Sequence, residues 1–439
     1  MKPQALRGFR DYLPEEMLAK NQMLTAVRDV FESHGYPPVE TPALEYSELL
    51  LGKYGEEGEM LLYRFTDNGD RDVALRYDLT VPLARLVATH GALQMPFRRY
   101  QIAPVWRAEK PAKGRFREFA QCDVDLVGVN DAGADAEMLL IGQDLMSRLG
   151  IERYRLRVNH RGVLRALTRR FGIEDGGEEG AFLRLLDKLE KIGEEKFRAS
   201  LKKDFRFDDR SADDLLQLAQ LSGPGMEVLE GLEAQLGDDP DGNAGIVRLR
   251  SVLELVEAGG NLETIQIDPS IARGLSYYTG LVYETFLDDL PEYGSVMSGG
   301  RYDQLVGMFA GRDLPAVGIS LGVDRLFAAL RELGKLETRS TPAQVMVIQF
   351  SESGAPDAYH LAAKLRAAGV SVVVYPTAAK LKKQYQCANQ LGIPFTAVIG
   401  ESEAERGTLQ LKDMNSGEQS ELEVAAAVSR LREMAEGLS

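Results

Sequence analysis

The chain has 439 residues, of which 44% are hydrophobic and 27% charged, a balance typical of a globular protein with two to four domains. Its 52 basic residues are outnumbered by 67 acidic ones, and the net charge of −15 disfavours a general nucleic-acid-binding protein. Two distant cysteines and four scattered histidines provide neither a disulfide framework nor metal-ligand spacing, and no apolar run approaches the ~18 residues of a membrane span. We therefore expect a reduced, cytoplasmic protein without a membrane segment or a resident metal.

The first part of the chain predicts a helix followed by strands in hairpin order. Apolar residues at helical spacing favour a helix over residues 14–33, and Gly35 ends it. An Asp-Asn-Gly-Asp turn at 67–70 joins two short strands, and the polar loop 108–114 joins two longer ones. The predicted strands are residues 62–66, 73–76, 98–107 and 115–128, and a second helix covers 135–149.

The remainder of the chain predicts a helical insertion and a separate C-terminal domain. Residues 168–262 are rich in charge and helical in pattern, whereas strands return at 281–286 and 316–321, with helices near Tyr302 and from Val323. After a linker at 333–342, strands at 345–350, 370–375 and 396–399 alternate with helices at 355–368 and 381–390. The predicted domains are residues 1–332, including the insertion, and an α/β unit at 343–439.

One face of the predicted strand 115–128 is unusually polar. Because side chains alternate along a strand, Gln121, Asp123 and Asp125 share one side, while the other side is apolar. An amide and two carboxylates in the middle of a sheet are costly unless partners or a ligand satisfy them. A water-facing side of an antiparallel sheet is the alternative, and this segment alone does not decide between the two.

Positive charge is concentrated around the same pair of strands. Residues 98–117 contain seven basic residues and one acidic residue, Glu109, which gives a local charge of +6. The planar guanidinium groups of the arginines suit a bidentate grip on a phosphate or a carboxylate. A solvated hairpin is the other explanation of this charge.

Two later segments combine glycines with side chains that can bind a ligand. Tyr277 and Tyr278 lie between Gly274 and Gly280 and offer a flat wall with hydroxyls, although packing is the commoner use of such a pair. The glycine-containing run 316–322 leads into a helix that begins close to Arg325, an arrangement suited to a nucleotide. Its spacing is neither that of a Walker loop nor that of a Rossmann fingerprint.

Together and in this order, these segments resemble the histidyl-tRNA synthetase family of class II aminoacyl-tRNA synthetases over essentially the whole chain. The resemblance implies an α+β fold, with an antiparallel-sheet catalytic domain, a helical insertion and a C-terminal α/β anticodon-binding domain. The segment Arg273-Gly274-Leu275-Ser276-Tyr277-Tyr278 is the most specific signal, since other class II synthetases lack it. Five further segments resemble segments of the family: residues 7–14 (N-terminal signature), 35–42 (motif 1), 75–80 (histidine-specific), 97–121 (motif 2) and 318–325 (motif 3).

The resemblance implies a histidine–tRNA ligase. Such an enzyme activates L-histidine with ATP to histidyl-adenylate and pyrophosphate, and then transfers histidine to the 3′ end of tRNA(His). Mg²⁺ is expected to accompany ATP, the protein is expected to be a homodimer, and the insertion is expected to cover the acceptor arm of the tRNA. The alternative is the synthetase-like regulatory subunit of ATP phosphoribosyltransferase, which typically lacks the anticodon domain and the intact Arg-Gly-Leu-x-Tyr-Tyr segment. A tRNA-sensing module without catalysis is a third possibility.

The resemblance also assigns roles by position. Arg107 would hold the ATP α-phosphate and the histidine carboxylate, Arg325 the γ-phosphate, and Arg273 would place a second cation on the α-phosphate. These three are the expected catalytic residues. The expected histidine-binding residues are Asp78, Leu79, Thr80, Arg107, Gln121, Asp125, Arg273, Tyr277 and Tyr278, and the expected ATP-binding residues are Arg107, Glu109, Arg115 and Arg325.

Within the histidine-binding set, the resemblance divides the work by substrate group. Asp78, Thr80 and Gln121 would hold the α-amino group, whereas Asp125 and Tyr278, with Tyr277 nearby, would recognise the imidazole. Many bacterial members have glutamate in place of the two aspartates, so we expect this chain to be closer to the archaeal and eukaryotic branch.

The distribution of charge is compatible with an RNA partner despite the acidic total. The insertion 168–262 carries a net −8 and residues 401–439 a net −5, whereas residues 98–117 carry +6 and residues 342–400 carry +3. Binding to a folded RNA needs local phosphate contacts, not a basic total. The charge therefore predicts a selective, salt-sensitive tRNA-binding protein.

Overall fold

The computed structural model describes residues 3–54, 58–111, 115–173, 177–221, 223, 225–272, 277–311, 313–336 and 339–436. The chain divides into two compact units, one of Met1–Arg10 with Met23–Lys335 and the other of Asp11–Gln22 with Leu336–Ser439. The domain limits expected at 332 and 343 stay a prediction. In the described ranges, no helix is long and apolar enough to cross a membrane.

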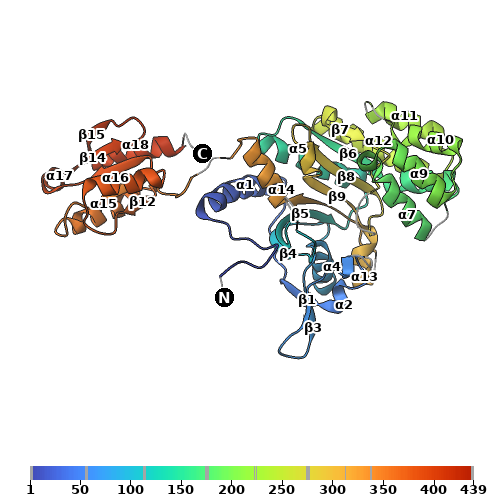
Figure 1. Ribbon diagram of the computed structural model, residues 1–439, viewed down its shortest axis with the longest axis horizontal. Helices are drawn as coiled ribbons and strands as arrows, with labels where there is room; N and C mark the ends of the chain where they lie inside the picture. Colours follow the sequence, from blue (N-terminus) through green and yellow to red (C-terminus); the bar gives the residue numbers. More distant parts are fainter. Residues whose placement is uncertain are drawn as a thin grey trace. The chain divides into compact units, whose positions relative to one another are not determined.

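A seven-stranded sheet is the framework of the first unit (Figure 1). Its order is β4-β5-β10-β9-β8-β6-β7; β6 and β7 pair in parallel, and the other neighbours pair antiparallel. The predicted antiparallel sheet is therefore confirmed. The strands are β4 (Phe97–Trp106), β5 (Glu118–Val127), β6 (Tyr154–His160), β7 (Ile265–Ile267), β8 (Leu281–Leu287), β9 (Met297–Arg301) and β10 (Ala316–Gly322).

The register of the sheet places specific partners on both sides of the polar face of β5. Asp125 pairs with Arg99 of β4 on one side, and Asp123 pairs with Ser320 of β10 on the other. Strand β9 was not among the predicted strands, and its two glycines weaken the strand pattern there. A Cβ at Gly299 would lie 2.1 Å from the carbonyl oxygen of Gly318, so close strand packing requires glycine there.

Helices pack on this sheet, and another helix precedes it in the chain. Helix α1 (Pro14–Ser33) has the predicted bounds, and Gly35 beyond it has a φ of 78°, in the left-handed region that favours glycine. Helix α5 (Ala132–Arg148) packs on β9 and β10, and α14 (Val323–Glu332) packs on β5 and β10. Asp131 caps α5 by accepting a hydrogen bond from the Gly133 N–H over 2.9 Å.

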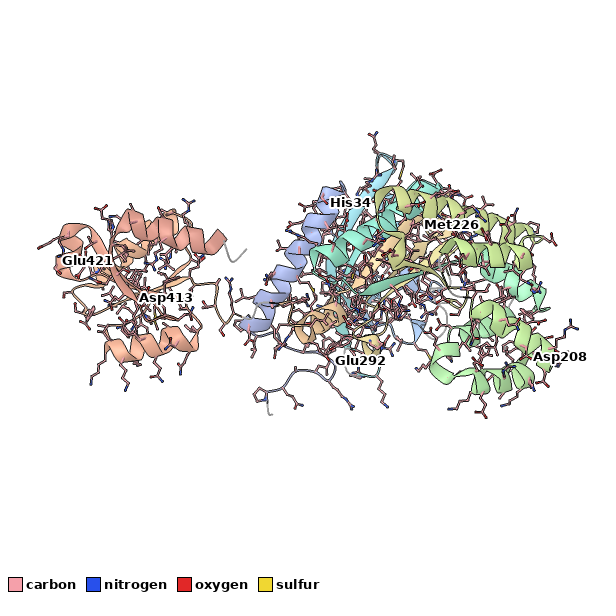
Figure 2. The ribbon with its side chains drawn as sticks, turned by 90° about the horizontal axis from the view of Figure 1, so that it is seen from above. His34, Asp208, Met226, Glu292, Asp413 and Glu421 are labelled. Carbon is pink, nitrogen blue, oxygen red and sulfur yellow. The ribbon has the colours of Figure 1, made fainter. Side chains whose placement is uncertain are left out.

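The insertion forms a helical lobe with a hydrophobic core of its own. Figure 1 shows α7, α9 and α10 gathered beside the sheet, and Phe182, Phe197 and Leu215 are fully buried among them. Asp208, labelled in Figure 2, caps α10 by accepting from the Ser211 N–H over 2.7 Å. The predicted helical character is confirmed. The helices of this region are α6 (Arg161–Arg170), α7 (Gly177–Leu186), α8 (Leu189–Ile192), α9 (Glu194–Phe205), α10 (Asp209–Ala219), α11 (Gly225–Leu236) and α12 (Pro240–Gly259).

A small three-stranded sheet lies at one end of the first unit. It has the order β1-β3-β2, and the predicted hairpin is present with Phe65 opposite Val73. Helix α4 packs against α13, and the chain just before α4 contributes to the cavity described below. The elements are β1 (Leu44–Tyr46), α2 (Ser47–Leu50), β2 (Arg64–Thr66), β3 (Asp72–Leu75), α4 (Thr80–Thr89) and α13 (Asp303–Ala310).

The second unit contains a five-stranded sheet of order β12-β11-β13-β14-β15. The three strands predicted from the sequence pair in parallel, and an unpredicted antiparallel hairpin extends the sheet. Figure 2 labels Asp413 and Glu421 on this hairpin, and Glu421 accepts from the Thr408 hydroxyl over 2.8 Å. The elements are β11 (Val345–Ile348), α15 (Ala355–Ala367), β12 (Val372–Val374), α16 (Leu381–Gln390), β13 (Phe395–Val398), α17 (Glu401–Arg406), β14 (Thr408–Asp413), β15 (Gln419–Glu423) and α18 (Val424–Glu436).

Candidate active site

A cavity of about 370 Å³ lies over the polar face of the seven-stranded sheet in the first unit. Side chains from β5, β8, β9 and β10 form its floor, and the chain before α4 and after β4 forms one wall. It collects residues that are far apart in the sequence. Nine of the expected site residues line it: Asp78, Thr80, Arg107, Glu109, Arg115, Gln121, Tyr277, Tyr278 and Arg325.

Two hydrogen-bond acceptors in this cavity have no partner among the described residues. The Asp78 carboxylate accepts from the Tyr54 hydroxyl over 3.0 Å and from the Val81 N–H over 3.1 Å, both at Oδ1. Gln121 Nε2 donates to the Ser320 hydroxyl over 2.9 Å. Asp78 Oδ2 and Gln121 Oε1 are among the buried atoms that have no hydrogen-bond partner in the described structure. An acceptor pair of this kind suits a cationic ligand group with several N–H donors.

Three arginines reach the cavity, Arg107 and Arg115 from the segment between β4 and β5, and Arg325 from α14. The Arg107 guanidinium donates to the Tyr77 carbonyl over 3.1 Å and lies 4.3 Å from the centre of the Tyr77 ring. Arg115 forms an ion pair of 2.5 Å with Glu109, and Arg325 donates to the Ser295 carbonyl. The three cations can therefore meet different parts of one extended anion.

Tyr277 and Tyr278 form an aromatic wall of the cavity. Their ring centres are 5.2 Å apart in an edge-to-face arrangement. Burial, together with nearby carboxylates, raises the pKa of both phenols above the ordinary value. Both hydroxyls stay protonated at neutral pH and can donate or accept a hydrogen bond.

Three expected site residues are not in the wall of the cavity. Leu79 is fully buried with Ala103 and Val105 beneath it, so its side chain cannot contact a ligand there. Asp125 is also buried below the wall, where it pairs with Arg99 and accepts a hydrogen bond from Tyr302. Arg273 lies outside the described residues.

The alternatives left open for β5 and for the basic hairpin are resolved by burial. Gln121, Asp123 and Asp125 are only 9%, 2% and 3% exposed, so the interpretation of this face as water-facing is wrong. Arg99 has no exposed surface and Arg107 lines the cavity, so these two guanidiniums do not belong to a solvated hairpin.

Several cavity residues were missed in the sequence. Glu284 on β8 is 8% exposed, and Ser320 on β10 contacts Gln121. Asp324 accepts from the Ala120 N–H over 3.2 Å and from Arg10 over 2.7 Å. The sequence did contain a signal for Glu284, because it is the one charged residue within a largely apolar strand. In the part of the chain that the structure describes, no group of three or more His, Cys, Asp or Glu could hold a metal ion.

A family model described as histidyl-tRNA synthetase matches residues 8–326. The chain belongs to the histidyl-tRNA synthetase family. A second model, described as an anticodon-binding domain, matches residues 344–434. These matches confirm the predicted class II fold with its C-terminal α/β domain, and they confirm the prediction of an enzyme of the histidine–tRNA ligase class.

Individual relatives agree with this family. The histidine–tRNA ligase of Rhodopirellula baltica is 43% identical over 420 residues, which are 95% of each chain. The solved histidyl-tRNA synthetase of Nostoc sp. is 35% identical with a TM-score of 0.90, covering 99% of this chain and 100% of its own. A Bacillus halodurans structure described as an ATP phosphoribosyltransferase regulatory subunit/histidyl-tRNA synthetase is 27% identical with a TM-score of 0.75, covering 89% and 97%.

These relatives are bacterial histidyl-tRNA synthetases or bacterial proteins with that description. They lend no support to the closer tie to archaeal and eukaryotic members that Asp78 and Asp125 had predicted.

Proposed function

We propose that this chain activates L-histidine with ATP to histidyl-adenylate and then transfers histidine to the 3′ end of tRNA(His). The single observation that carries this proposal is the composition of one cavity. It combines arginines for phosphate and carboxylate, acceptors for an ammonium group, and two tyrosine hydroxyls for an imidazole. Histidine and ATP together present these same groups.

The first step needs alignment and charge neutralisation more than proton transfer. The histidine carboxylate attacks the α-phosphorus of ATP in line, a P–O bond forms, and pyrophosphate leaves with the electron pair of the broken P–O bond. We assign Arg107 to the α-phosphate and the histidine carboxylate, Arg325 to the γ-phosphate, and Arg273 to a second contact with the α-phosphate. Guanidiniums fixed around the phosphate stabilise the charge that develops on its oxygens.

The unpartnered acceptors support the assignment of Asp78, Thr80 and Gln121 to the α-amino group. An ammonium group would supply the hydrogens that Asp78 Oδ2 and Gln121 Oε1 lack in the described structure. Burial raises the pKa of Asp78, and a bound ammonium favours its ionised form. The charge of the substrate would therefore complete this site.

We assign recognition of the imidazole to the hydroxyls of Tyr277 and Tyr278. The role expected for Asp125 becomes indirect in this proposal, because Arg99 and Tyr302 engage its oxygens. The Tyr302 ring centre is 6.0 Å from that of Tyr277, so Asp125 supports the tyrosine wall from behind. Polar groups left unpaired by a wrong amino acid would give a discrimination of about 10⁴–10⁵.

ATP is proposed to contact Arg115 and Glu109 in addition to Arg107 and Arg325. Mg²⁺ is proposed to enter with ATP, held by phosphate oxygens and at most one or two carboxylates, for which Glu109 and Glu284 line the cavity. A cytoplasmic homodimer, the domain limits 1–332 and 343–439, and an insertion that covers the acceptor arm complete the proposal.

The regulatory subunit of ATP phosphoribosyltransferase is the second candidate, favoured by the similarity to the Bacillus halodurans structure whose description names both proteins. The match of residues 344–434 to an anticodon-binding domain favours the ligase instead, because the regulatory subunit typically lacks this domain. A tRNA sensor without catalysis is disfavoured by the arginines in the cavity.

Histidine-dependent exchange between ATP and pyrophosphate, followed by charging of tRNA(His), tests the proposal. We expect exchange with histidine and not with the other amino acids, and charging of tRNA(His) on its addition. No exchange together with stimulation of an ATP phosphoribosyltransferase catalytic subunit would establish the second candidate. Binding of tRNA without exchange would establish the sensor.

A further inference from the structure

A serine on β10 joins two polar side chains of β5. Ser320 lies directly opposite Asp123 across the antiparallel pair of strands. Gln121 Nε2 donates to Ser320 Oγ over 2.9 Å, and the Ser320 hydroxyl lies near enough to the Asp123 carboxylate to stabilise its ionised form. Ser320 and Gln121 line the cavity, whereas Asp123 lies buried beneath it.

The chemistry of these three groups gives the chain of hydrogen bonds one direction. An ionised carboxylate only accepts, so the Ser320 hydroxyl directs its single hydrogen toward Asp123, its cross-strand neighbour. The oxygen of Ser320 is then free to accept, and the NH₂ group of Gln121 is the donor it accepts from. Gln121 is thereby left with its carbonyl oxygen, Oε1, as the atom without a partner among the described residues.

This donor-to-acceptor direction requires an ionised Asp123, and the surroundings of Asp123 set the pH range in which its carboxylate is ionised. Burial, with the nearby carboxylates of Asp125 and Asp78, raises the pKa of Asp123 to about 7, while Arg99 opposes that rise. At about pH 8 the Asp123 carboxylate is mainly ionised, and the direction from Gln121 through Ser320 to Asp123 is fixed.

We propose that Ser320 and Asp123 are positioning residues that hold the Gln121 amide with its oxygen, and not its NH₂ group, toward the α-amino group of histidine. This inference rests on the proposed function and extends it from Gln121 to two residues that act through it. With the amide reversed, two donors would face each other and the ammonium would lose one acceptor.

The variant Ser320→Ala removes only the hydroxyl that connects Gln121 with Asp123. At about pH 8 we expect the KM for histidine in pyrophosphate exchange to rise about tenfold or more, and the KM for ATP to change little. Ser320→Thr keeps the hydroxyl and is expected to restore the KM for histidine. Asp123→Asn lets the hydroxyl of Ser320 turn, and we expect a smaller rise in the same KM.

Two competitive inhibitors separate positioning from general damage to the cavity. Histidinol keeps the amino group and the imidazole, whereas 3-(imidazol-4-yl)propionate lacks the amino group. The inhibition constant of histidinol is expected to rise in Ser320→Ala in parallel with the KM for histidine, and that of imidazolepropionate is expected to stay unchanged.

Three results would overturn the inference while leaving the proposed function intact. The first is an unchanged KM for histidine in Ser320→Ala and in Asp123→Asn. The second is a loss of affinity for imidazolepropionate in Ser320→Ala as large as that for histidinol, and the third is a failure of Ser320→Thr to restore histidine binding. A failure of the proposed function is seen separately, as an absence of histidine-dependent exchange in the unmodified protein.

Discussion

Arg99 and Asp125 form a buried ion pair beneath the cavity, with 2.7 Å between Arg99 Nη2 and Asp125 Oδ2. The two residues are cross-strand partners on β4 and β5, and Arg99 also donates to the Leu79 carbonyl over 3.2 Å. Asp123 lies near the same guanidinium. One buried cation therefore reduces the cost of burying two carboxylates on the polar face of β5.

Replacing Arg99 with methionine is expected to destabilise the fold strongly. Arg99→Met keeps much of the volume but leaves Asp123 and Asp125 buried without a cation, which costs about 3–5 kcal/mol. Arg98→Met is the matched control on the same strand, because Arg98 and its partner Glu137 are 35% and 23% exposed and such a pair contributes about 0–1 kcal/mol. Urea denaturation measures both, and equal losses of stability would contradict the role of the buried pair.

The polar face of β5 shows what could and could not be predicted from the sequence. Alternation along one strand was enough to place Gln121, Asp123 and Asp125 on one face, since that depends only on local geometry. It could not tell which of them reaches the cavity, because this depends on the register with Arg99 of β4 and with Ser320 of β10. Asp125 was accordingly expected at the ligand and lies below the wall.

The helices and strands likewise divide into those that local sequence predicts and those that depend on pairing with distant segments. The limits of α1 follow from a local apolar period and from Gly35, and they were predicted correctly. Strand β9 was missed because Gly299 and Gly300 weaken its pattern, and it is stabilised instead by pairing with β8 and β10 on either side. The cavity itself joins Asp78, Gln121 and Arg325, which only the resemblance to a family had brought together before the fold was known.

Removing the charge of Asp78 is expected to weaken histidine binding and to spare ATP binding. Asp78→Asn converts a charge-assisted contact with the α-amino group into a neutral one, and we expect the KM for histidine to rise about 10–100-fold. Asp72→Asn is the control, since the Asp72 carboxylate is exposed and pairs with Arg64 away from the cavity. A parallel rise in the KM for ATP would assign Asp78 to the nucleotide instead.

Arg273→Ala is expected to abolish histidine-dependent pyrophosphate exchange and to leave the fold intact. The family resemblance places a second cation on the α-phosphate at this position, and loss of such a group costs about 10²–10³-fold in rate. Circular dichroism checks the fold, and Arg250→Ala, at an ion pair with Glu233 in the helical insertion, is the control. An exchange rate equal to that of the unmodified protein would remove Arg273 from the catalytic residues.

Asp123 is expected to make the stability of the protein depend on pH. Burial raises the pKa of Asp123 from 3.8 to about 7, so between these values the folded state keeps a proton that the unfolded chain has released. The free energy of unfolding therefore contains a term that falls as pH rises through this window, by about 1.4 kcal/mol per pH unit at most. Asp123→Asn cannot ionise and lacks that term. The free energy of unfolding of both proteins can be measured by urea denaturation between about pH 5 and about pH 8. As pH rises, we expect Asp123→Asn to gain stability relative to the unmodified protein, with most of this gain reached at about pH 7, the pKa of Asp123. A difference that stays constant, or that moves the other way, would mean that Arg99 keeps Asp123 ionised throughout this range.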